Sequence, residues 1–368
     1  MSSGFLSPLF FMGLANFGEY VPPPTVVPDV GFVNGLYVQI TVTNYHGVPL
    51  GELAADVESV TWLLNEAGRA RLDVPNPGTA AELIQFGNRV LIEFDNGLAD
   101  WTGYIDPPRR WRYGSAMLTV YGGERLLKHR VTDRGRYFTR ATAGAMLRAL
   151  LQEQAAPPVV EIGSVWLGGG GHSPDYHFKD LYTVARDSLA RLEAADFDVT
   201  GRMEGGRLRL RANFYARKGF DLADVWLLEG HNIDVGDPEE QGEIVNEWFL
   251  AGAGTGWSET ARAYSSARDE QSIRAYGLRQ GAEILAGVSR QETLDAHAAG
   301  NLADSAEPYL SLPFTAINLA PGRFADYGIG DRVNIELYSY FEDGFTGMRR
   351  VIGREFRPRE GGCVTMVV

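Results

Sequence analysis

One short stretch of the sequence combines imidazole and carboxylate side chains, the groups that could hold a transition metal. Four such residues lie close together: His172, Asp175, His177 and Asp180. Zinc and iron accept these ligands, but the spacing matches no familiar ligand set, and the stretch follows the glycine run 168–171, which is typical of a flexible loop. We therefore predict no metal and no cofactor. The stretch is interpreted as a polar loop leading into a helix, with Asp180 near the helix N-terminus, where negative charge is favourable.

Other catalytic patterns are weak or missing. The sequence contains no G-x-S-x-G elbow, no H-E-x-x-H and no phosphate-binding G-x-x-x-x-G-K-[ST]. The pairs Asp56–Glu58 and Glu239–Glu240 could serve a glycosidase, which needs two carboxyl groups across a cleft. With 47 acidic residues, however, such pairs arise by chance. Cys363 is expected to be a buried or edge thiol. We predict that the chain is not an enzyme.

Positive charge is concentrated in one segment of an acidic chain. The sequence has 34 Lys and Arg against 47 Asp and Glu, a net charge of −13, which argues against gripping nucleic acid or an anionic membrane by bulk charge. Between residues 107 and 140, nine basic residues stand against only Glu124 and Asp133. This segment is either a basic face for an acidic partner subunit or a solvated strand face in a protein that favours arginine.

Length and composition bound the architecture. At roughly 100–200 residues per domain, 368 residues predict two to three domains, and 44 glycines among short strand-like runs favour β structure rich in turns. The single cysteine excludes an internal disulfide. No apolar run reaches the about 18 residues of a spanning helix, so we expect no membrane partner.

Alternating apolar and polar residues predict about six antiparallel strands between residues 36 and 122. Runs such as Val38–Thr43 and Val90–Phe94 have the period of two of a half-buried strand, and Asp-Asn-Gly at 95–97 is a hairpin turn. This is about the size of a small closed barrel. We therefore assign residues 36–130 to a first β-barrel domain.

Helical spacing then replaces the strand pattern. Apolar residues at 146–151 and 181–192 predict two amphipathic helices, and a hairpin turned at 204–206 follows. We assign residues 131–225 to a lateral α/β domain.

Strand patterns return in the last third of the chain. Residues 226–254 and 311–368 are assigned to a second β-barrel domain, since strand-rich modules at both ends suggest one barrel type used twice, and residues 255–310 to a second lateral insertion. Within the insertion, Ser289 and Glu292 have the spacing of a capping box that opens a helix.

The first 35 residues are an apolar arm. The run from Phe5 to Phe17 could suggest a signal peptide, but no Lys or Arg precedes Arg69, Pro8 interrupts the run and no A-x-A site follows. The arm, residues 1–35, packs either on its own chain or on a neighbouring subunit.

Several motifs follow one another in a fixed order along residues 36–368. V-T-W-L-L-N at 60–65 leads to A-R-L-D-V-P at 70–75, and F-G-N-R-V-L-I at 86–92 leads to W-T-G-Y-I at 101–105. The series continues with T-A-G-A-M-L at 142–147, D-E-Q-S-I-R-A-Y-G at 269–277 and Y-G-I-G-D-R-V at 327–333. In this order the motifs resemble the baseplate-hub family of tailed bacteriophages, including the N-terminal hub module of siphophage tail-associated proteins.

The resemblance implies a mainly β fold with an α/β insert, in which two tube-like β-barrel domains are joined by lateral α+β domains. It implies a homotrimer whose six barrels form a ring that adapts the sixfold tail tube to a threefold tip. DNA would pass through the central channel without specific binding. Members with a peptidase, lysozyme or fibre region carry it C-terminally; because this sequence ends at Val368, we expect such activities on another protein.

The implied location is the tail tip of the virion, after assembly in the host cytoplasm. The implied partners are the distal tail or tail tube protein, the tape measure protein, and a central tail fibre or spike. We hypothesise that four apolar residues of the arm anchor it on an adjacent tail protein: Phe10, Phe11, Leu14 and Phe17.

Two other classes of function stay open. Trp and Tyr on strands can stack on sugars, as in a carbohydrate-binding, adhesin-like tail protein, and an unrecognised acidic pair could serve a cell-wall hydrolase. A glycan array tests the first alternative, and a peptidoglycan-release assay tests the second.

Deleting residues 1–30 is expected to leave the fold intact and to impair tail assembly, because the arm contributes docking rather than core. Circular dichroism of the shortened chain checks the fold, and incorporation into tails checks assembly. Unchanged assembly would contradict the docking role.

Overall fold

The computed structural model describes residues 38–132, 136–153, 160–176, 178–189, 195–236, 239–254, 262–339, 344–360 and 363–367. The arm residues Phe10, Phe11, Leu14 and Phe17 lie outside this part of the chain. Within the described ranges, none of the helices combines the length and apolar character needed to cross a bilayer.

Residues 38–122 form a series of strands joined by turns, as the period of two predicts. The strands are β1 (Val38–Thr43), β2 (Pro49–Glu52), β3 (Asp56–Leu63), β4 (Arg69–Pro75), β5 (Arg89–Phe94), β6 (Trp101–Ile105), β7 (Arg110–Arg112) and β8 (Ser115–Gly122). Every second residue points into a common core, in which Val42, Leu72 and Val120 are completely buried. A 3-10 helix, η1 (Gly123–His129), follows β8.

The lateral region combines helices with a small sheet. It contains β9 (Arg136–Tyr137), α1 (Ala143–Gln152), β10 (Glu161–Val165), β11 (Asp175–Tyr176), α2 (Leu181–Thr183), a π-helix η2 (Val184–Leu189), β12 (Asp196–Glu204) and β13 (Arg207–Tyr215). Thr142 caps α1 by accepting a hydrogen bond from the Ala145 N–H. The predicted second helix does begin at Leu181, but it continues from Val184 as a π-helix.

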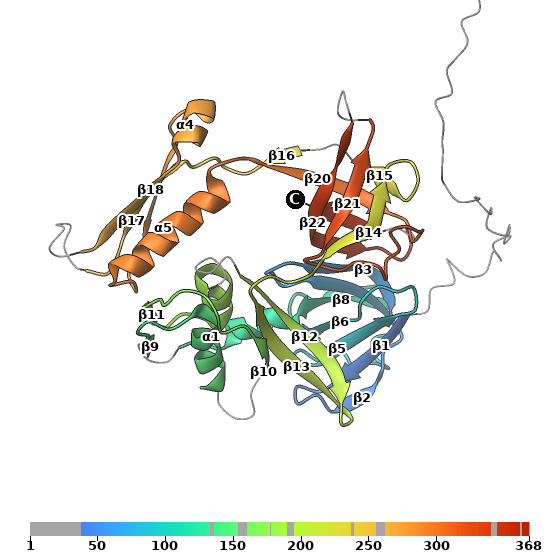
Figure 1. The fold of residues 1–368 in the computed structure, drawn as a ribbon. Helices are drawn as coiled ribbons and strands as arrows, with labels where there is room; N and C mark the ends of the chain where they lie inside the picture. Colours follow the sequence, from blue (N-terminus) through green and yellow to red (C-terminus); the bar gives the residue numbers. More distant parts are fainter. Residues whose placement is uncertain are drawn as a thin grey trace, which may run out of the picture. The chain divides into compact units, whose positions relative to one another are not determined.

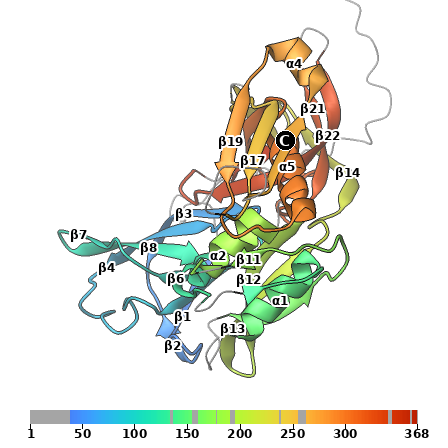
Figure 2. The same ribbon diagram turned by 90° about the vertical axis from the view of Figure 1, so that its left-hand side faces the viewer.

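The last third of the chain holds a second group of strands and an insertion. The strands are β14 (Asp221–Leu228), β15 (Ile233–Val235), β16 (Glu239–Gln241), β20 (Tyr309–Ala316), β21 (Arg332–Leu337), β22 (Phe345–Phe356) and β23 (Cys363–Val367). The insertion contains β17 (Glu247–Ala251), β18 (Tyr264–Arg268), α4 (Glu270–Tyr276), β19 (Gln280–Ile284) and α5 (Gln291–Ser305). Figure 2 shows β17 and β19 beside each other with α5 across them.

The insertion differs from the sequence prediction at two points. β17 lies in the range assigned to the second barrel, yet it pairs with β18 and β19, because Leu250 packs against α5 in a separate small core. The capping box at Ser289 does not form: Arg290 occupies the N-cap of α5 and no side chain caps the helix. Ser289 therefore lies one residue before the N-cap.

One long strand joins the two strand-rich regions into a single sheet (Figure 1). The first half of β22 pairs with β21, and its second half pairs with both β23 and β3, so that Phe356 lies opposite Val60. The described strands run in the order β15-β20-β23-β22-β3-β4-β8-β6-β5-β1-β2, with β14, β16, β21 and β7 off this path.

The mainly β class is confirmed, with large and largely antiparallel sheets. Among the described strands no closed barrel is found. Closure into two barrels and the exact domain boundaries stay predictions.

Aromatic side chains pack where the two strand-rich regions meet along β22 and β3, a contact that we call the seam. The Phe356 ring is 2% exposed and meets the rings of Phe94 and Phe324 edge-on, with centroids 5.8 and 6.1 Å away. Phe94 also contacts Trp62 at 5.6 Å. The pairing of β22 with β3 is therefore covered by apolar packing that both regions supply.

Phe356→Ala is expected to lower the free energy of unfolding by about 3–5 kcal/mol, because it empties a packed aromatic site. Phe220→Ala is the matched control: Phe220 is 77% exposed, and its truncation should change stability by less than about 0.5 kcal/mol. Denaturant unfolding of the two variants measures the difference. Equal effects would contradict the role of this seam.

Candidate functional site

Asp196 is the point at which three regions of the chain meet. It begins β12 and is only 2% exposed. The Asn65 side chain of the β3–β4 turn donates to its Oδ1 at 3.0 Å, the Lys218 backbone N–H donates to Oδ2 at 2.7 Å, and the Arg350 guanidinium of β22 forms an ion pair with Oδ2. A buried carboxylate is stable only with such compensation, so Asp196 fastens the three regions together.

The turn residue Asn65 is shaped for this contact. It has a left-handed backbone (φ 59°), which asparagine tolerates better than most residues. Its side-chain oxygen accepts a hydrogen bond from the Phe197 N–H at 2.8 Å, while its amide donates to Asp196. One turn side chain therefore binds the start of β12 twice.

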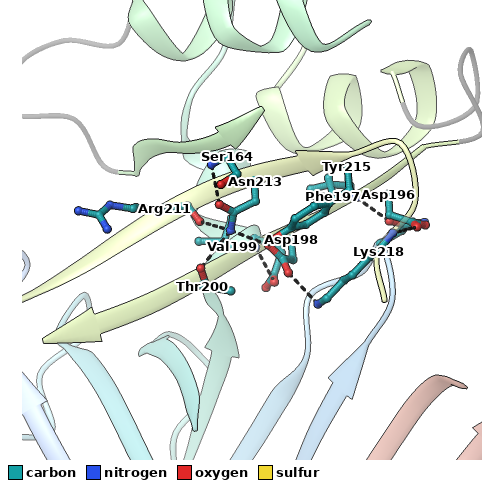
Figure 3. A network of polar contacts seen from close by, with 12 residues as sticks. Ser164, Asp196, Phe197, Asp198, Val199, Thr200, Arg211, Asn213, Tyr215 and Lys218 are labelled. Carbon is teal, nitrogen blue, oxygen red and sulfur yellow. Dashed lines mark hydrogen bonds and ion pairs between the residues drawn. The ribbon is translucent and has the colours of Figure 1, made fainter. Parts of the chain in front are cut away.

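Asp198 forms a second buried anion on the same face of β12 (Figure 3). Its position two residues after Asp196 places both carboxylates on one side of the strand, while Phe197 and Val199 point into the core. The Lys218 Nζ lies 2.7 Å from Asp198 Oδ2, and the Asn213 amide donates to Oδ1 at 2.8 Å.

Tyr215 adds a weaker contact from its hydroxyl to Asp198 Oδ1 at 3.4 Å. Burial and the neighbouring carboxylate raise the pKa of Tyr215, so this hydroxyl keeps its proton and stays a donor.

Glu124 of η1 contacts the main chain of β12 and lines the same pocket as Asp198. Its Oε1 accepts a hydrogen bond from the Val199 N–H at 3.0 Å. Burial, as the main cause, raises the pKa of Glu124 to about 7, and the Asp198 carboxylate adds to the rise while Lys218 opposes it. Near neutral pH this carboxyl therefore exchanges between its neutral and charged forms.

A pocket of about 110 Å³ opens beside these groups, and its lining includes Trp62, Trp101, Glu124, Asp198 and Lys218. Of the carboxylates that border it, Glu124 accepts a hydrogen bond from a main-chain N–H and Asp198 pairs with Lys218. Groups held in this way are fixed in orientation, which suits a structural role. We call Asp196 and Asp198, together with the residues that bind them, the joint; its other members include Asn65, Lys218 and Arg350.

Comparison with known proteins gives a result at the level of the fold. No family model matches the sequence, and no curated protein matches it. Among solved structures, the 43 kDa tail protein of prophage MuSo2 from Shewanella oneidensis is similar, with a TM-score of 0.57 and 13% identity over 90% of this chain and 98% of that one. A tail protein from Neisseria meningitidis MC58 gives a TM-score of 0.53 and 15% identity over 90% and 95% of the two chains.

The chain has the fold of phage tail proteins. The same fold occurs in the E. coli protein c3393, a component of the type VI secretion system described as structurally similar to the T4 tail proteins gp27 and gp5. That similarity has a TM-score of 0.50 and 10% identity over 85% of this chain and 73% of the other. The likeness to phage tail proteins that the motif series implies is thereby found at the level of the fold.

The histidine and aspartate stretch occupies structural positions in this tail-protein fold. Asp180 is the N-cap of α2, as predicted, and accepts hydrogen bonds from the Thr183 N–H and hydroxyl, both at 2.8 Å. His172 is buried and forms a β-bridge with Ala141. His177 lies outside the described residues.

The other chemical candidates are also held by their surroundings. Asp56 pairs with Arg359 at 3.5 Å and Glu58 pairs with Arg112 at 3.6 Å, so the two carboxylates are not a free acid–base pair. Cys363 is buried, and burial raises the pKa of its thiol, which disfavours the nucleophilic thiolate.

The residues of the joint were not found from the sequence. The sequence pattern places D-F-D-V at 196–199 in the hairpin turned at 204–206 and no more, although two charges on one face of an otherwise buried strand are unusual. That signal could have singled out Asp196 and Asp198. The partner Arg350 lies 154 residues further on, and nothing in the local pattern points to it.

Arg350→Met is expected to lower the free energy of unfolding by about 3–5 kcal/mol, because it leaves the Asp196 charge buried without its cation. Arg332→Met is the control, since Arg332 pairs with Asp221 at 3.4 Å on the surface and should cost less than about 1 kcal/mol. Adding Asp196→Asn to Arg350→Met should recover stability. Additive losses in the double variant would contradict the coupling.

The free energy of unfolding is expected to fall as the pH rises from about 4.5 to 7. Over this window the folded state keeps the Glu124 proton that the unfolded state has lost, given folded and ordinary pKa values of about 7 and 4.5. The loss is about 3 kcal/mol. Glu124→Gln should remove this component and be the more stable protein at pH 8. Parallel pH profiles of both proteins in denaturant unfolding would contradict the assignment.

Proposed function

We propose that the chain is a structural hub protein of a phage tail tip or baseplate, and that it assembles as a trimeric ring. The observation that carries the proposal is the length of the likeness to the MuSo2 tail protein, which spans 90% of this chain and 98% of the other. A likeness of this extent involves both strand-rich regions together, whereas a shared small module would cover only one of them.

Two features of the chain support a ring: the number of its strand-rich regions and the fixed connection between them. Each chain carries two strand-rich regions, which β22 and β3 connect through one ladder. Three copies then supply six such regions, which matches a sixfold tube on one face and a threefold tip on the other. A ring also requires a fixed angle between the two strand-rich regions of each chain. Asp196 restrains that angle because it binds Asn65 of the first region and Arg350 of the second.

The proposed role is non-enzymatic. A ring of three chains, each with two tube-like barrels, would leave a central channel, through which DNA passes without specific binding because the chain is acidic overall. We propose a place at the virion tail tip, with the distal tail or tail tube protein, the tape measure protein and a central fibre or spike as neighbours. The arm residues Phe10, Phe11, Leu14 and Phe17 are proposed to anchor on one of these neighbours.

The purified chain is expected to form particles of three times the 40.4 kDa mass of one chain, with a central opening. Mass photometry measures the mass, and negative-stain electron microscopy with particle classification measures the symmetry. A chain that stays monomeric even when mixed with its tail tube protein would contradict the ring. Specific binding to a glycan array would instead favour an adhesin.

A further inference from the structure

A second pocket, of about 240 Å³, has a strongly basic lining. It lies where the β3–β4 hairpin, the end of β8, η1 and α2 meet. Its charged side chains are Arg69, Arg125 and Lys128, and its rings are Tyr121 and Tyr182; the remaining lining residues are uncharged. We call this the basic pocket.

The fold fixes the positions of the three cations. Arg69 of β4 lies directly opposite Tyr121 of β8 in the antiparallel ladder, so both side chains are on the same face of the sheet. The Arg125 guanidinium carbon lies 3.6 Å from the centre of the Tyr121 ring. Lys128 follows Arg125 by one turn of the 3-10 helix, which places both on one helix face.

Tyr182 completes the pocket from the lateral region. The Lys128 Nζ lies 4.7 Å from the centre of its ring, and its hydroxyl accepts a hydrogen bond from the Ala67 N–H at 3.3 Å. The aromatic faces hold the cations without neutralising them, because a cation–π contact adds no negative charge.

Acidic side chains compensate little of this charge. Asp106 lies 3.7 Å from Arg125, and Glu66 pairs with Arg186 instead of with the pocket. In the part of the chain that the structure describes, no ion pair joins Arg69 or Lys128 to a carboxylate, and both residues are exposed. The basic pocket therefore carries net positive charge on a protein whose total charge is −13.

We propose that the basic pocket binds an acidic peptide segment of a partner protein, through carboxylates placed between Arg69 and Lys128. Guanidinium groups bind carboxylates through paired charge-assisted hydrogen bonds, and arginine and tyrosine are enriched at the energetic centres of protein interfaces. The cations converge in one recess, whereas a nucleic-acid groove needs cations spread along a backbone track.

This inference divides the basic segment 107–140 into two parts. Arg112 is neutralised by Glu58 and Asp73, at 3.6 and 3.9 Å, as in a solvated strand face. Arg125 and Lys128 instead form a basic face for an acidic partner. The inference rests on the proposed function only in that a tail protein has partners, and it holds whether or not the chain forms rings.

The test uses the full chain and a hexaglutamate peptide, with binding followed by isothermal titration calorimetry at low salt. The double variant Arg69→Gln/Lys128→Gln should weaken binding by about tenfold or more, because two charge-assisted contacts are lost. Arg110→Gln is the matched control: Arg110 is exposed and belongs to the same basic segment, and its removal should leave the affinity unchanged. Thermal unfolding checks that each variant is folded.

Equal affinity of the peptide for the wild type and the double variant would overturn the proposal. So would tighter binding of a single-stranded oligonucleotide that the double variant loses, since the site would then serve nucleic acid. Ring formation is read separately from the particle mass, so a monomeric chain that binds the peptide leaves this proposal standing while the ring fails.

Discussion

The burial of the Asp196 carboxylate is the constraint on which the arrangement of the regions depends. An anion that is 2% exposed needs donors around it, and here they come from Asn65, the Lys218 backbone and Arg350. These donors belong to the first strand-rich region, the lateral region and the second strand-rich region. The charge is fully compensated only when all three are in place, which couples their folding and fixes their mutual orientation.

The sheet and the ion pair restrain the same seam in different ways. The ladder between β22 and β3 sets the register of the two strand-rich regions, and the ring contacts of Phe356 exclude water from it. The Asp196–Arg350 pair then ties the lateral region to β22. Backbone pairing, apolar packing and a buried charge thus act on one strand, which explains how a chain with several cores can behave as one body.

Much of the fold could be predicted from the sequence, because strand periodicity is a local property. Val38–Thr43 is strand β1, and the helix predicted at 146–151 is α1. Short elements could not be predicted: β7 has three residues, which are too few to show a hydrophobic period. The contacts of the joint could not be predicted for a different reason. The charges at 196 and 198 stand out locally, but Asp196 meets its partners 131 and 154 residues away, and no local window shows which residues these are.

The seam between β22 and β3 also bears on how such chains change over evolutionary time. Its hydrogen bonds use main-chain groups, which every residue except proline supplies. Substitutions along the two strands can therefore accumulate without breaking the join, provided that inward positions stay apolar. The fold is shared with the Shewanella tail protein at 13% identity over 90% of this chain and 98% of the other, which is compatible with such tolerance. What this fold requires of a sequence along the join is therefore an alternation of apolar and polar residues rather than particular residues.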